Sequence, residues 1–415
     1  MKNLTSLHFL QKEWLVLVCM AAMILLAFPG AVQALPAGLI PSPPQVAAES
    51  YVLVDAMTGT VLAEKNSNQQ LPPASLTKMM TAYVVQSEIT KNRIKPDSLV
   101  TVSEKAWRMK GSLMFIEVGE KVSVSDLLKG VIIVSGNDAS VALAEYVAGS
   151  ESGFSQMMNR VAVNLDMSNT HFMNASGWPA EDHYSSAQDL AKLARVIATE
   201  ESEYYHLYAQ KEFQYGVDKR TGKPLSPQAN RNTLLFMNTN VDGIKTGHSD
   251  EAGYCLVASS KREGRRLIAV VMGARSERSR ANETQKLLTY GFRFFDNVDI
   301  KKKNVTLEKV RIWKGVQNEL SVGLEQDLFV TVARGKEKDV QATMLIDNNI
   351  TAPVAHFQEV GGVKVRLGEQ VIAVAPLVAL ESIEEGGFFK RLWDSIVHFF
   401  VGLLGAEATQ AIIDS

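Results

Sequence analysis

Between residues 72 and 80 the chain reads Pro72-Pro73-Ala74-Ser75-Leu76-Thr77-Lys78-Met79-Met80, which places a serine three residues before a lysine. Apolar residues continue at helical spacing through Tyr83 and Val84, so the stretch is typical of a helix buried along one side. The paired prolines suit a helix entrance, where missing backbone N–H groups cost nothing. Ser75 and Lys78 should then share one helix face, with their Cβ atoms about 5–6 Å apart.

A serine three residues before a lysine suits nucleophilic catalysis. A serine hydroxyl is a weak nucleophile until a neighbouring base removes its proton. Lys78 could be that base if its pKa falls by several units, through burial or through a second cation nearby. Taken alone, however, this spacing more often marks an exposed helix face.

A second motif, Ser135-Gly136-Asn137, follows an apolar run and precedes a predicted buried helix from Asp138 to Ala148. A loop there would place the Ser135 hydroxyl between Lys78 and the leaving amine of a substrate. The amide of Asn137 would hold the substrate backbone.

The third motif, Lys245-Thr246-Gly247, lies beside apolar strand patterns. Its lysine supplies positive charge for a terminal carboxylate, its threonine supplies a hydroxyl, and its glycine leaves room for the substrate. The same lysine could be the second cation that lowers the pKa of the helix lysine. We expect an oxyanion hole from the backbone N–H groups of Ser75 and His248.

The three motifs in this order are those of penicillin-binding serine enzymes. Their surroundings resemble the low-molecular-mass penicillin-binding proteins of the penicillin-binding protein 5/6 type, which are D-alanyl-D-alanine carboxypeptidases. The similarity extends from about Tyr51 to Phe295, and more loosely to the C-terminus. It is carried by the segments Tyr51–Ala56, Gly111–Phe115, Asn230–Asn232, Val241–His248 and Tyr290–Phe295.

The resemblance assigns a role to each matching residue. Ser75 would be the acylated nucleophile, Lys78 the proton acceptor and Ser135 the second active serine. Arg231 resembles an arginine that helps to recognise the terminal carboxylate. The substrate-binding set would be Asn137, Arg231, Lys245, Thr246, Gly247 and His248. Two departures, Ser249 where threonine is usual and Trp178 where leucine is expected, affect only fine substrate preference.

The resemblance also implies the reaction. Such an enzyme removes the terminal D-alanine from peptidoglycan stem pentapeptides through a Ser75 acyl-enzyme, and it takes part in cell-wall remodelling and cell shape. β-Lactams would acylate the same serine. The alternatives are a β-lactamase, which in class A needs an added glutamate, and a wall-binding scaffold without activity. No Glu-x-x-Leu-Asn pattern lies between Ser135 and Lys245, and the complete motif set argues against a scaffold.

Composition excludes several other classes of protein. The 415 residues include 43 Lys and Arg against 45 Asp and Glu, which argues against a nucleic-acid partner. No group of His, Cys, Asp and Glu has convincing metal spacing, and no Gly-rich phosphate loop is present, so we expect no metal and no cofactor. Cys255, on an apolar strand pattern, is predicted to be a buried core thiol.

The N-terminus resembles an export signal. Residues 1–34 combine early lysines, an apolar core and the small-residue site Val32-Gln33-Ala34, and we favour cleavage there over an uncleaved anchor. Residues 35–49, rich in Pro and Ala, would form a flexible leader. The protein would then be exported to the periplasmic face of the cytoplasmic (inner) membrane.

The remaining chain divides into two predicted domains. Residues 50–296 form an α+β catalytic domain, in which hairpins at both ends (Tyr51–Val54 with Val61–Glu64, and Gly253–Ser259 with Arg266–Gly273) build one antiparallel sheet. The helix Asn282–Phe294 would cover that sheet. The resemblance implies a β-lactamase/transpeptidase-like fold. After a linker at Lys301–Lys303, Val-rich runs in residues 300–380 predict a small all-β sandwich.

The tail, residues 385–405, has the pattern of an amphipathic helix. It is too short and too charged to span a bilayer, but it suits a helix in the membrane interface. The alternative is a terminal helix packed on the β domain. The resemblance favours a peripheral membrane anchor. The apolar positions are Phe388, Phe389, Leu392, Trp393, Ile396, Val397, Phe400, Leu403 and Leu404.

Overall fold

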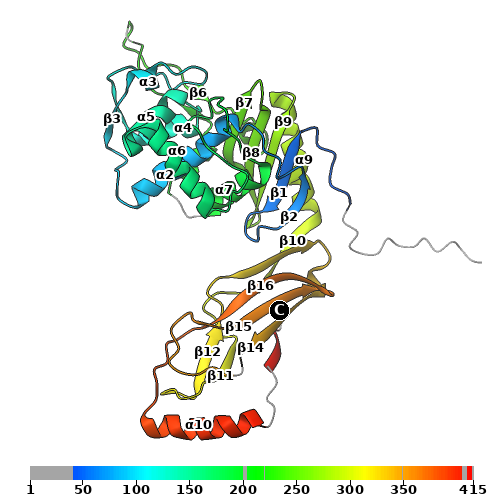
Figure 1. The fold of residues 1–415 in the computed structure, drawn as a ribbon. Coiled ribbons are helices and arrows are strands. Elements are labelled where there is room, and N and C mark those ends of the chain that lie inside the picture. Colours follow the sequence, from blue (N-terminus) through cyan, green and yellow to red (C-terminus); the bar gives the residue numbers. More distant parts are fainter. Residues whose placement is uncertain (1–40, 200–202, 219, 348, 404–408, 414–415) are drawn as a thin grey trace, which may run out of the picture. The chain divides into compact units, whose positions relative to one another are not determined.

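The computed structural model describes residues 41–199, 203–218, 220–347, 349–403 and 409–413 (Figure 1). The predicted signal at residues 1–34 lies outside the described residues. So do residues 35–40 of the predicted leader and the last two residues of the predicted 385–405 helix.

One antiparallel sheet organises the first domain. Among the described residues it has five strands in the order β2-β1-β9-β8-β7. Val52 of the first strand pairs with Val270, so segments from both ends of the domain meet at its centre, as expected from the sequence. The strands are β1 (Ser50–Asp55), β2 (Val61–Lys65), β7 (Val241–Ser249), β8 (Gly253–Arg262) and β9 (Arg265–Ala274).

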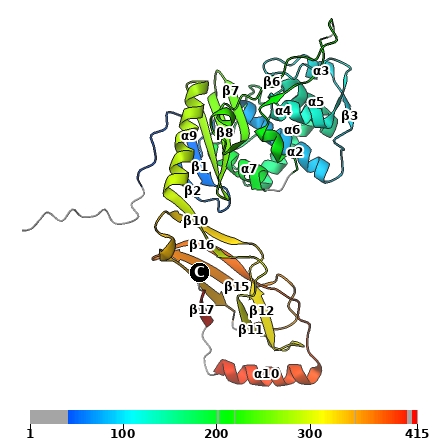
Figure 2. The same cartoon turned by 180° about the vertical axis from the view of Figure 1, so that it is seen from behind.

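Alternating side chains bury both faces of this sheet. Val52 and Val270 belong to a core shared with the helical layer, whereas Leu53 and Val271 belong to a second core. That second core is closed by α9 (Glu277–Phe294), which lies on the face away from α2 and α7 (Figures 1 and 2). This helix begins five residues earlier than the sequence indicated, because the Ser276 hydroxyl caps it by accepting the Ser279 N–H at 3.1 Å.

The helical layer holds the residues of the first two motifs. Ser75 lies in a single 3-10 turn, η1 (Ala74–Leu76), that leads directly into the buried helix, and Ala74 has a positive φ of 45°. The larger helices are α2 (Thr77–Thr90), α4 (Val124–Ile132), α5 (Asn137–Ala148), α6 (Glu151–Asn164) and α7 (Ala187–Thr199). The smaller elements are α3 (Glu104–Trp107), η2 (Tyr205–Ala209), α8 (Leu234–Met237) and the pairs β3 (Leu99–Thr101) with β4 (Lys121–Ser123) and β5 (Glu212–Phe213) with β6 (Gln228–Ala229).

Residues 41–49 make ordered contacts with the first domain. The Val46 side chain is 8% exposed, and the Glu49 N–H donates to the Met272 carbonyl at 3.1 Å. The Ala47 N–H donates to the Glu283 carboxylate, also at 3.1 Å. This part of the predicted leader therefore packs on α9 and the sheet, because its apolar residues are buried in the second core.

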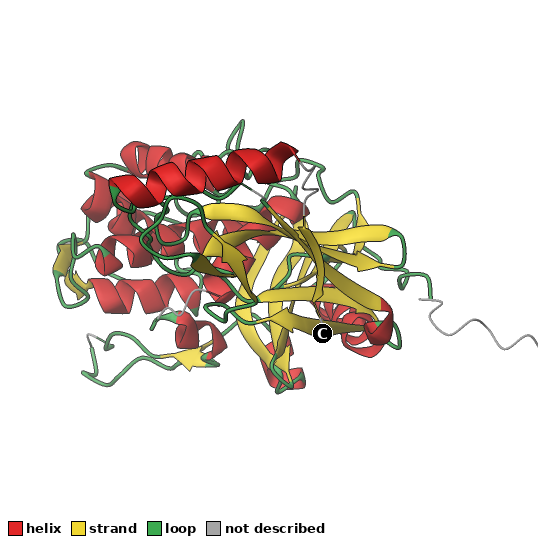
Figure 3. Ribbon diagram, turned by 90° about the horizontal axis from the view of Figure 1, so that it is seen from below, coloured by secondary structure: helices red, strands yellow, loops and turns green. Residues whose placement is uncertain are grey.

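The second domain is built of strands, as expected (Figure 3). Among the described residues, β10 pairs with β13, and six more strands form a sheet in the order β11-β12-β16-β15-β14-β17. The first strand, β10 (Phe295–Lys301), follows α9 without a break, so Lys301 ends a strand and does not begin a separate linker. The others are β11 (Glu308–Arg311), β12 (Glu319–Gly323), β13 (Leu328–Ala333), β14 (Val340–Ile346), β15 (Glu359–Leu367), β16 (Gln370–Ala379) and β17 (Thr409–Ile413), with η3 (Glu337–Asp339) between β13 and β14.

The predicted tail helix is present as α10 (Phe388–Leu403). Within the described part of the chain, no helix is long and apolar enough to cross a membrane. A further strand, β17, follows the helix and pairs with β14, which the sequence pattern did not reveal.

Candidate active site

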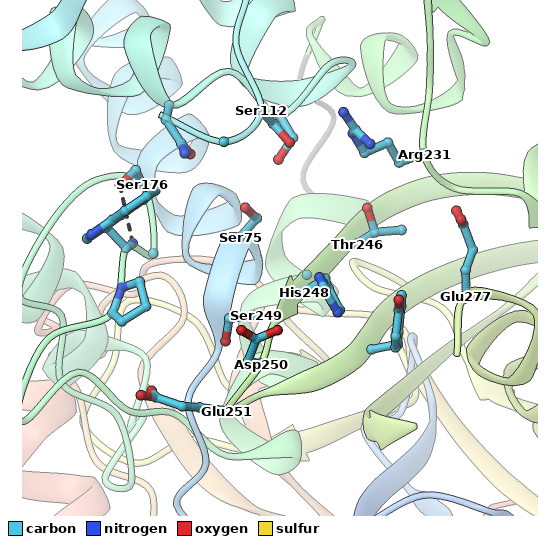
Figure 4. A pocket seen from close by; sticks show the side chains of 18 of the residues that line it. Ser75, Ser112, Ser176, Arg231, Thr246, His248, Ser249, Asp250, Glu251 and Glu277 are labelled. Carbon is cyan, nitrogen blue, oxygen red and sulfur yellow. Dashed lines mark hydrogen bonds between the residues drawn. The ribbon is translucent and has the colours of Figure 1, made fainter. Parts of the chain in front are cut away.

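A cavity of about 690 Å³ brings the three motifs together. Its wall includes Ser75 from the 3-10 turn, Ser135 from the loop before α5, and Thr246 from β7. Arg231, also named from the sequence, lines the same space (Figure 4). Asn137, Gly247 and His248 complete the predicted residues in the wall, whereas Lys78 and Lys245 are buried and do not line it.

Lys78 lies directly behind the serine. Its Nζ donates to Ser75 Oγ at 2.9 Å, to Asn137 Oδ1 at 2.7 Å and to the Ser176 carbonyl at 2.6 Å. The side chain is 1% exposed. Burial lowers the pKa of Lys78 to about 7, although the nearby Asp138 carboxylate acts in the opposite direction. A substantial share of neutral amine is therefore present near neutral pH, as a general base requires.

The loop that contains Ser176 is fixed against the nucleophile's turn. Gly177 has a φ of +78°, and a Cβ there would lie only 1.8 Å from the Ala74 carbonyl oxygen. The Asn174 side chain accepts the Gly177 N–H at 2.8 Å and donates to the Trp178 carbonyl at 2.8 Å. Glycine is required at position 177 because no side chain fits between the two backbones.

The second motif forms a tight turn between α4 and α5. Ser135 is 2% exposed and has a φ of 63°, a conformation that residues other than glycine rarely adopt. Asn137 bonds to Lys78 through its oxygen and to the Lys110 carbonyl through its nitrogen, at 2.6 Å. Asn137 thus orients the lysine, and its predicted contact with the substrate backbone stays a prediction.

Asp138 holds the adjacent loop, a role that the sequence did not reveal. Its buried carboxylate accepts the backbone N–H groups of Met114 and Phe115 at 2.9 and 2.8 Å, and that of Ile116 at 3.3 Å. These bonds fix the loop that carries Ser112 into the cavity wall. The sequence showed only that Asp138 is an acidic residue at the start of a predicted helix. Such residues are usually explained by their favourable interaction with the helix dipole.

Lys245 lies beneath the cavity. It is 3% exposed, and its Nζ donates to the Thr246 carbonyl at 3.2 Å. Burial, followed by the positive charge of Lys78, holds the pKa of Lys245 well below its ordinary value. The positive charge of Lys78 thus lowers the pKa of Lys245, whereas the low pKa of Lys78 comes from burial, and the predicted effect of Lys245 on Lys78 stays a prediction.

The edge strand β7 borders the cavity and touches the nucleophile's turn. A Cβ at Gly247 would lie 2.9 Å from the Pro73 carbonyl oxygen and 3.2 Å from the Leu76 side chain. The His248 ring stacks on Tyr254, with 4.0 Å between the ring centroids. Among the described residues β7 is the last strand of its sheet, so one of its edges is not paired with another strand.

Two arginines, Arg231 and Arg280, line the cavity near this strand. Arg231 faces the cavity, and its carbonyl accepts a bond from Arg280 at 3.1 Å. Arg280, which is 4% exposed, also approaches the Gly247 carbonyl at 3.4 Å and the Glu277 carboxylate at 3.0 Å. Sequence reasoning missed Arg280, since it lies in α9, far along the chain from the three motifs.

Neither His183 nor Cys255 lines the cavity. His183 is buried, its Nε2 lies 2.9 Å from Thr77 Oγ1, and burial lowers its pKa to about 4. Cys255 is fully buried, which confirms the predicted core thiol, and burial raises its pKa to about 11. No group of His, Cys, Asp and Glu in the described residues could hold a metal ion.

Comparison with known proteins identifies the family. Residues 38–276 match the model of the D-alanyl-D-alanine carboxypeptidase family, and residues 295–385 match that of the penicillin-binding protein 5 C-terminal domain. The chain is 42% identical to D-alanyl-D-alanine carboxypeptidase DacC of Escherichia coli K12, over 86% of this chain and 89% of that protein.

Solved structures agree with these matches. Penicillin-binding protein 5 of Haemophilus influenzae superposes with a TM-score of 0.76 at 38% identity, covering 83% of this chain and 99% of that one. Penicillin-binding protein D2 of Listeria monocytogenes, solved in an ampicillin-bound form, gives a TM-score of 0.54 at 28% identity, covering 60% and 99%.

The fold and the site are those of a penicillin-binding serine peptidase. The chain belongs to the D-alanyl-D-alanine carboxypeptidase family, and its activity is serine-type D-Ala-D-Ala carboxypeptidase action in cell-wall metabolism.

Proposed function

We propose that Ser75 attacks the peptide carbonyl between the two terminal D-alanines of a stem pentapeptide while Lys78 accepts its proton. The observation that carries this proposal is the 2.9 Å contact between Lys78 Nζ and Ser75 Oγ, made by a buried lysine with a pKa of about 7. An adjacent base of this kind is what a serine nucleophile needs. The C–N bond then breaks, and an acyl-enzyme ester forms on Ser75.

Ser135 is proposed to relay the proton to the departing D-alanine amine. Its hydroxyl belongs to the same cavity wall as Ser75, in a turn whose backbone conformation is fixed. Water then attacks the ester, Ser75 recovers its proton, and the shortened peptide leaves. The backbone N–H groups of Ser75 and His248 are the proposed oxyanion hole.

We assign direct contact with the substrate's terminal carboxylate to Arg231 and Thr246, because both line the cavity. Lys245 lies beneath them and contributes charge. An anion that enters the cavity raises the pKa of Lys245 toward its ordinary value and so strengthens binding. Gly247 and His248 on edge strand β7 would pair with the extended peptide, as exposed strand edges commonly do.

β-Lactams would acylate Ser75 in the same geometry. The structural relative from Listeria was solved with ampicillin bound, which supports a β-lactam as a ligand for this cavity as well. We further propose that catalysis resides in residues 50–296 and that the β domain, residues 300–380, acts as a spacer or contact module.

The proposed location is the periplasmic face of the cytoplasmic membrane. Residues 1–34 would direct export and be cleaved, and the α10 helix would attach the protein peripherally to the lipid surface. There the enzyme reaches peptidoglycan, and removal of terminal D-alanines supports a role in wall remodelling and cell shape.

The decisive experiment combines two measurements on one protein. Mass analysis of a D-Ala-D-Ala pentapeptide should show loss of one alanine, and labelled penicillin should be captured at Ser75. The Ser75→Ala variant should lose both, whereas Ser87→Ala, on the same helix, should keep both. Labelling of the Ser75→Ala variant at another serine would refute the assignment.

A further inference from the structure

Helix α10 presents its apolar side chains to solvent and turns a charged side chain toward the β domain. Asp394, near the middle of the helix, is only 1% exposed. A helix that merely packed on the domain would show the opposite arrangement, with the apolar side buried. The exposed apolar residues are Phe388 (66%), Phe389 (84%), Leu392 (50%), Trp393 (66%), Ile396 (45%) and Phe399 (66%).

Asp394 is the centre of the contact between the helix and the β domain. Its carboxylate accepts the Lys314 backbone N–H at 2.7 Å and a guanidinium N–H of Arg311 at 3.4 Å. Lys390, one turn earlier, pairs with the same carboxylate. Burial alone would raise the pKa of Asp394, but these donors outweigh it and hold the pKa below its usual value. Asp394 is therefore ionised, and its carboxylate joins the helix to the β domain through these bonds.

Further contacts attach the helix along its length. Ahead of it, the Gly386 N–H donates to the Lys314 carbonyl at 2.8 Å. Toward its C-terminal half, His398 Nε2 lies 2.8 Å from Asn349 Oδ1, and the His398 ring lies 4.7 Å from the ring of Trp313. Beyond the helix, β17 pairs with β14 of the same domain. The chain is thus attached before, along and after α10 (Figure 2).

The outward face fits a lipid surface. The helix has 16 residues, so it is about 24 Å long and too short to cross a hydrocarbon layer of about 30 Å. Its exposed aromatic and aliphatic side chains extend along the helix from Phe388 to Phe399. Arg391, whose side chain is 43% exposed and pairs with Glu385, suits anionic headgroups. Lys390 instead pairs with Asp394, the helix's one acidic residue, which is turned inward.

We propose that α10 binds the bilayer while it remains docked on the β domain, and that Asp394 is the positioning residue that decides which side of the helix meets the lipid. This inference rests on the proposed peripheral membrane location and adds its geometry. The β domain would then lie directly on the lipid surface through α10, with no free chain between them. The ligand class is a bilayer that contains anionic headgroups.

A cross-link tests whether docking and lipid binding coexist. In full-length mature protein, Asn349→Cys and His398→Cys would be joined by a short bis-maleimide, since these side chains are in contact and Cys255 is buried. The probe is a vesicle of phosphatidylethanolamine and phosphatidylglycerol in a flotation assay. We expect the cross-linked protein to bind within about twofold of the uncross-linked double variant, because the apolar face remains free.

The possible outcomes separate the two claims. If neither form binds vesicles, the proposed membrane location is refuted. This outcome includes the case in which the apolar face of α10 pairs with a second copy of the chain. If the uncross-linked form binds and the cross-linked form binds more than about tenfold more weakly, the location stands and docking during binding is refuted.

Asp394 is tested by the rate of the same cross-link. We expect Asp394→Ala to slow cross-linking by about tenfold or more in solution and on vesicles, and Asp394→Glu to restore part of it. Asp339→Ala, which removes a surface carboxylate paired with Lys336, is the matched control and should change nothing. Far-UV circular dichroism and thermal unfolding monitor folding of every variant, and penicillin capture at Ser75 monitors the catalytic domain. An unchanged cross-linking rate in Asp394→Ala would refute the positioning role.

Discussion

Gly247 lies against Pro73 so closely that a Cβ atom at residue 247 would be 2.9 Å from the Pro73 carbonyl oxygen. The contact joins edge strand β7 to the turn that presents Ser75, although the two segments are far apart in the sequence. The glycine therefore sets the spacing between the nucleophile and the strand that borders the cavity.

A methyl group at this contact should separate the two elements. We expect Gly247→Ala to slow acylation by penicillin at least about tenfold, because overpacking at a close backbone contact typically costs about 1–3 kcal/mol. Gly362→Ala in β15, where the nearest contact of an added Cβ is an ordinary 3.7 Å, serves as the control. Stopped-flow acylation of both variants provides the comparison, and equal rates would show that β7 is not held by this contact.

The acylation rate should depend on pH through Lys78. The neutral amine is the active base, so the rate should rise as pH increases through about 7 and then level off. Asp138 raises the pKa of Lys78, so Asp138→Asn should move this rise to lower pH. Asp126→Asn, a surface change on α4, should leave the midpoint in place. A profile that is flat between pH 5.5 and 9 would point to a base other than Lys78.

The roles of Arg231 and Lys245 can be tested with two ligands that differ only in whether the terminal carboxylate is free or esterified. A charge-assisted bond is worth about 1.5–3 kcal/mol, so Arg231→Gln should weaken a carboxylate ligand by about 10–150-fold and its ester far less. If Lys245 acts by its charge alone, Lys245→Gln should also weaken binding of the carboxylate ligand more than binding of its ester. Competition against labelled penicillin measures both. Equal losses for acid and ester in Lys245→Gln would place this residue in proton transfer.

Outward side chains of α10 should carry the attachment to membranes. Replacing Phe389 and Trp393 by serine should release the protein from membrane fractions, because burial of each large apolar side chain contributes about 1.5–3 kcal/mol. Val374→Ser, which changes an apolar residue of similar exposure (64%) in β16, should not. Carboxypeptidase activity on small peptides should be kept in both variants. Retention of the double variant on membranes would assign the attachment to another surface.

Local patterns were sufficient to predict much of the site and the first domain. The spacing of Ser75 and Lys78 placed them on one helix face, since three residues is close to one helical turn, and the other two motifs supported the catalytic interpretation. The hairpin at Tyr51 was predicted from its resemblance to the family's opening hairpin, and the strand at Cys255 from its apolar run. The contacts that tune the site were not accessible in this way. Asp138 and Arg280 act across distant segments, and no local pattern encodes a tertiary contact.

The β domain shows the same limit. Strand β10 follows α9 without a break. The run Lys301–Lys303, which begins at its last residue, resembled a linker, although Val298 and Ile300 alternate in strand fashion. Strand β12 has only Leu320 and Val322 as its buried apolar pair, too few for a periodicity. The helical pattern of the tail predicted α10, but an aspartate on its polar side gave no sign that it would be the buried residue.

The pairing of β1 with β9 also governs when the enzyme can become active. Val52 meets Val270 across the centre of the sheet, so the first strand has no neighbour on that side until most of the domain has been made. Closing so long a loop costs conformational entropy before the β1–β9 contacts form and offset that cost. Folding through this non-local pairing is therefore slow. In a chain made from its N-terminus, Ser75 is therefore present before β7 can reach it. Until the last strands arrive, the cavity lacks the wall that β7 supplies, so the incomplete domain has no assembled site for acylation.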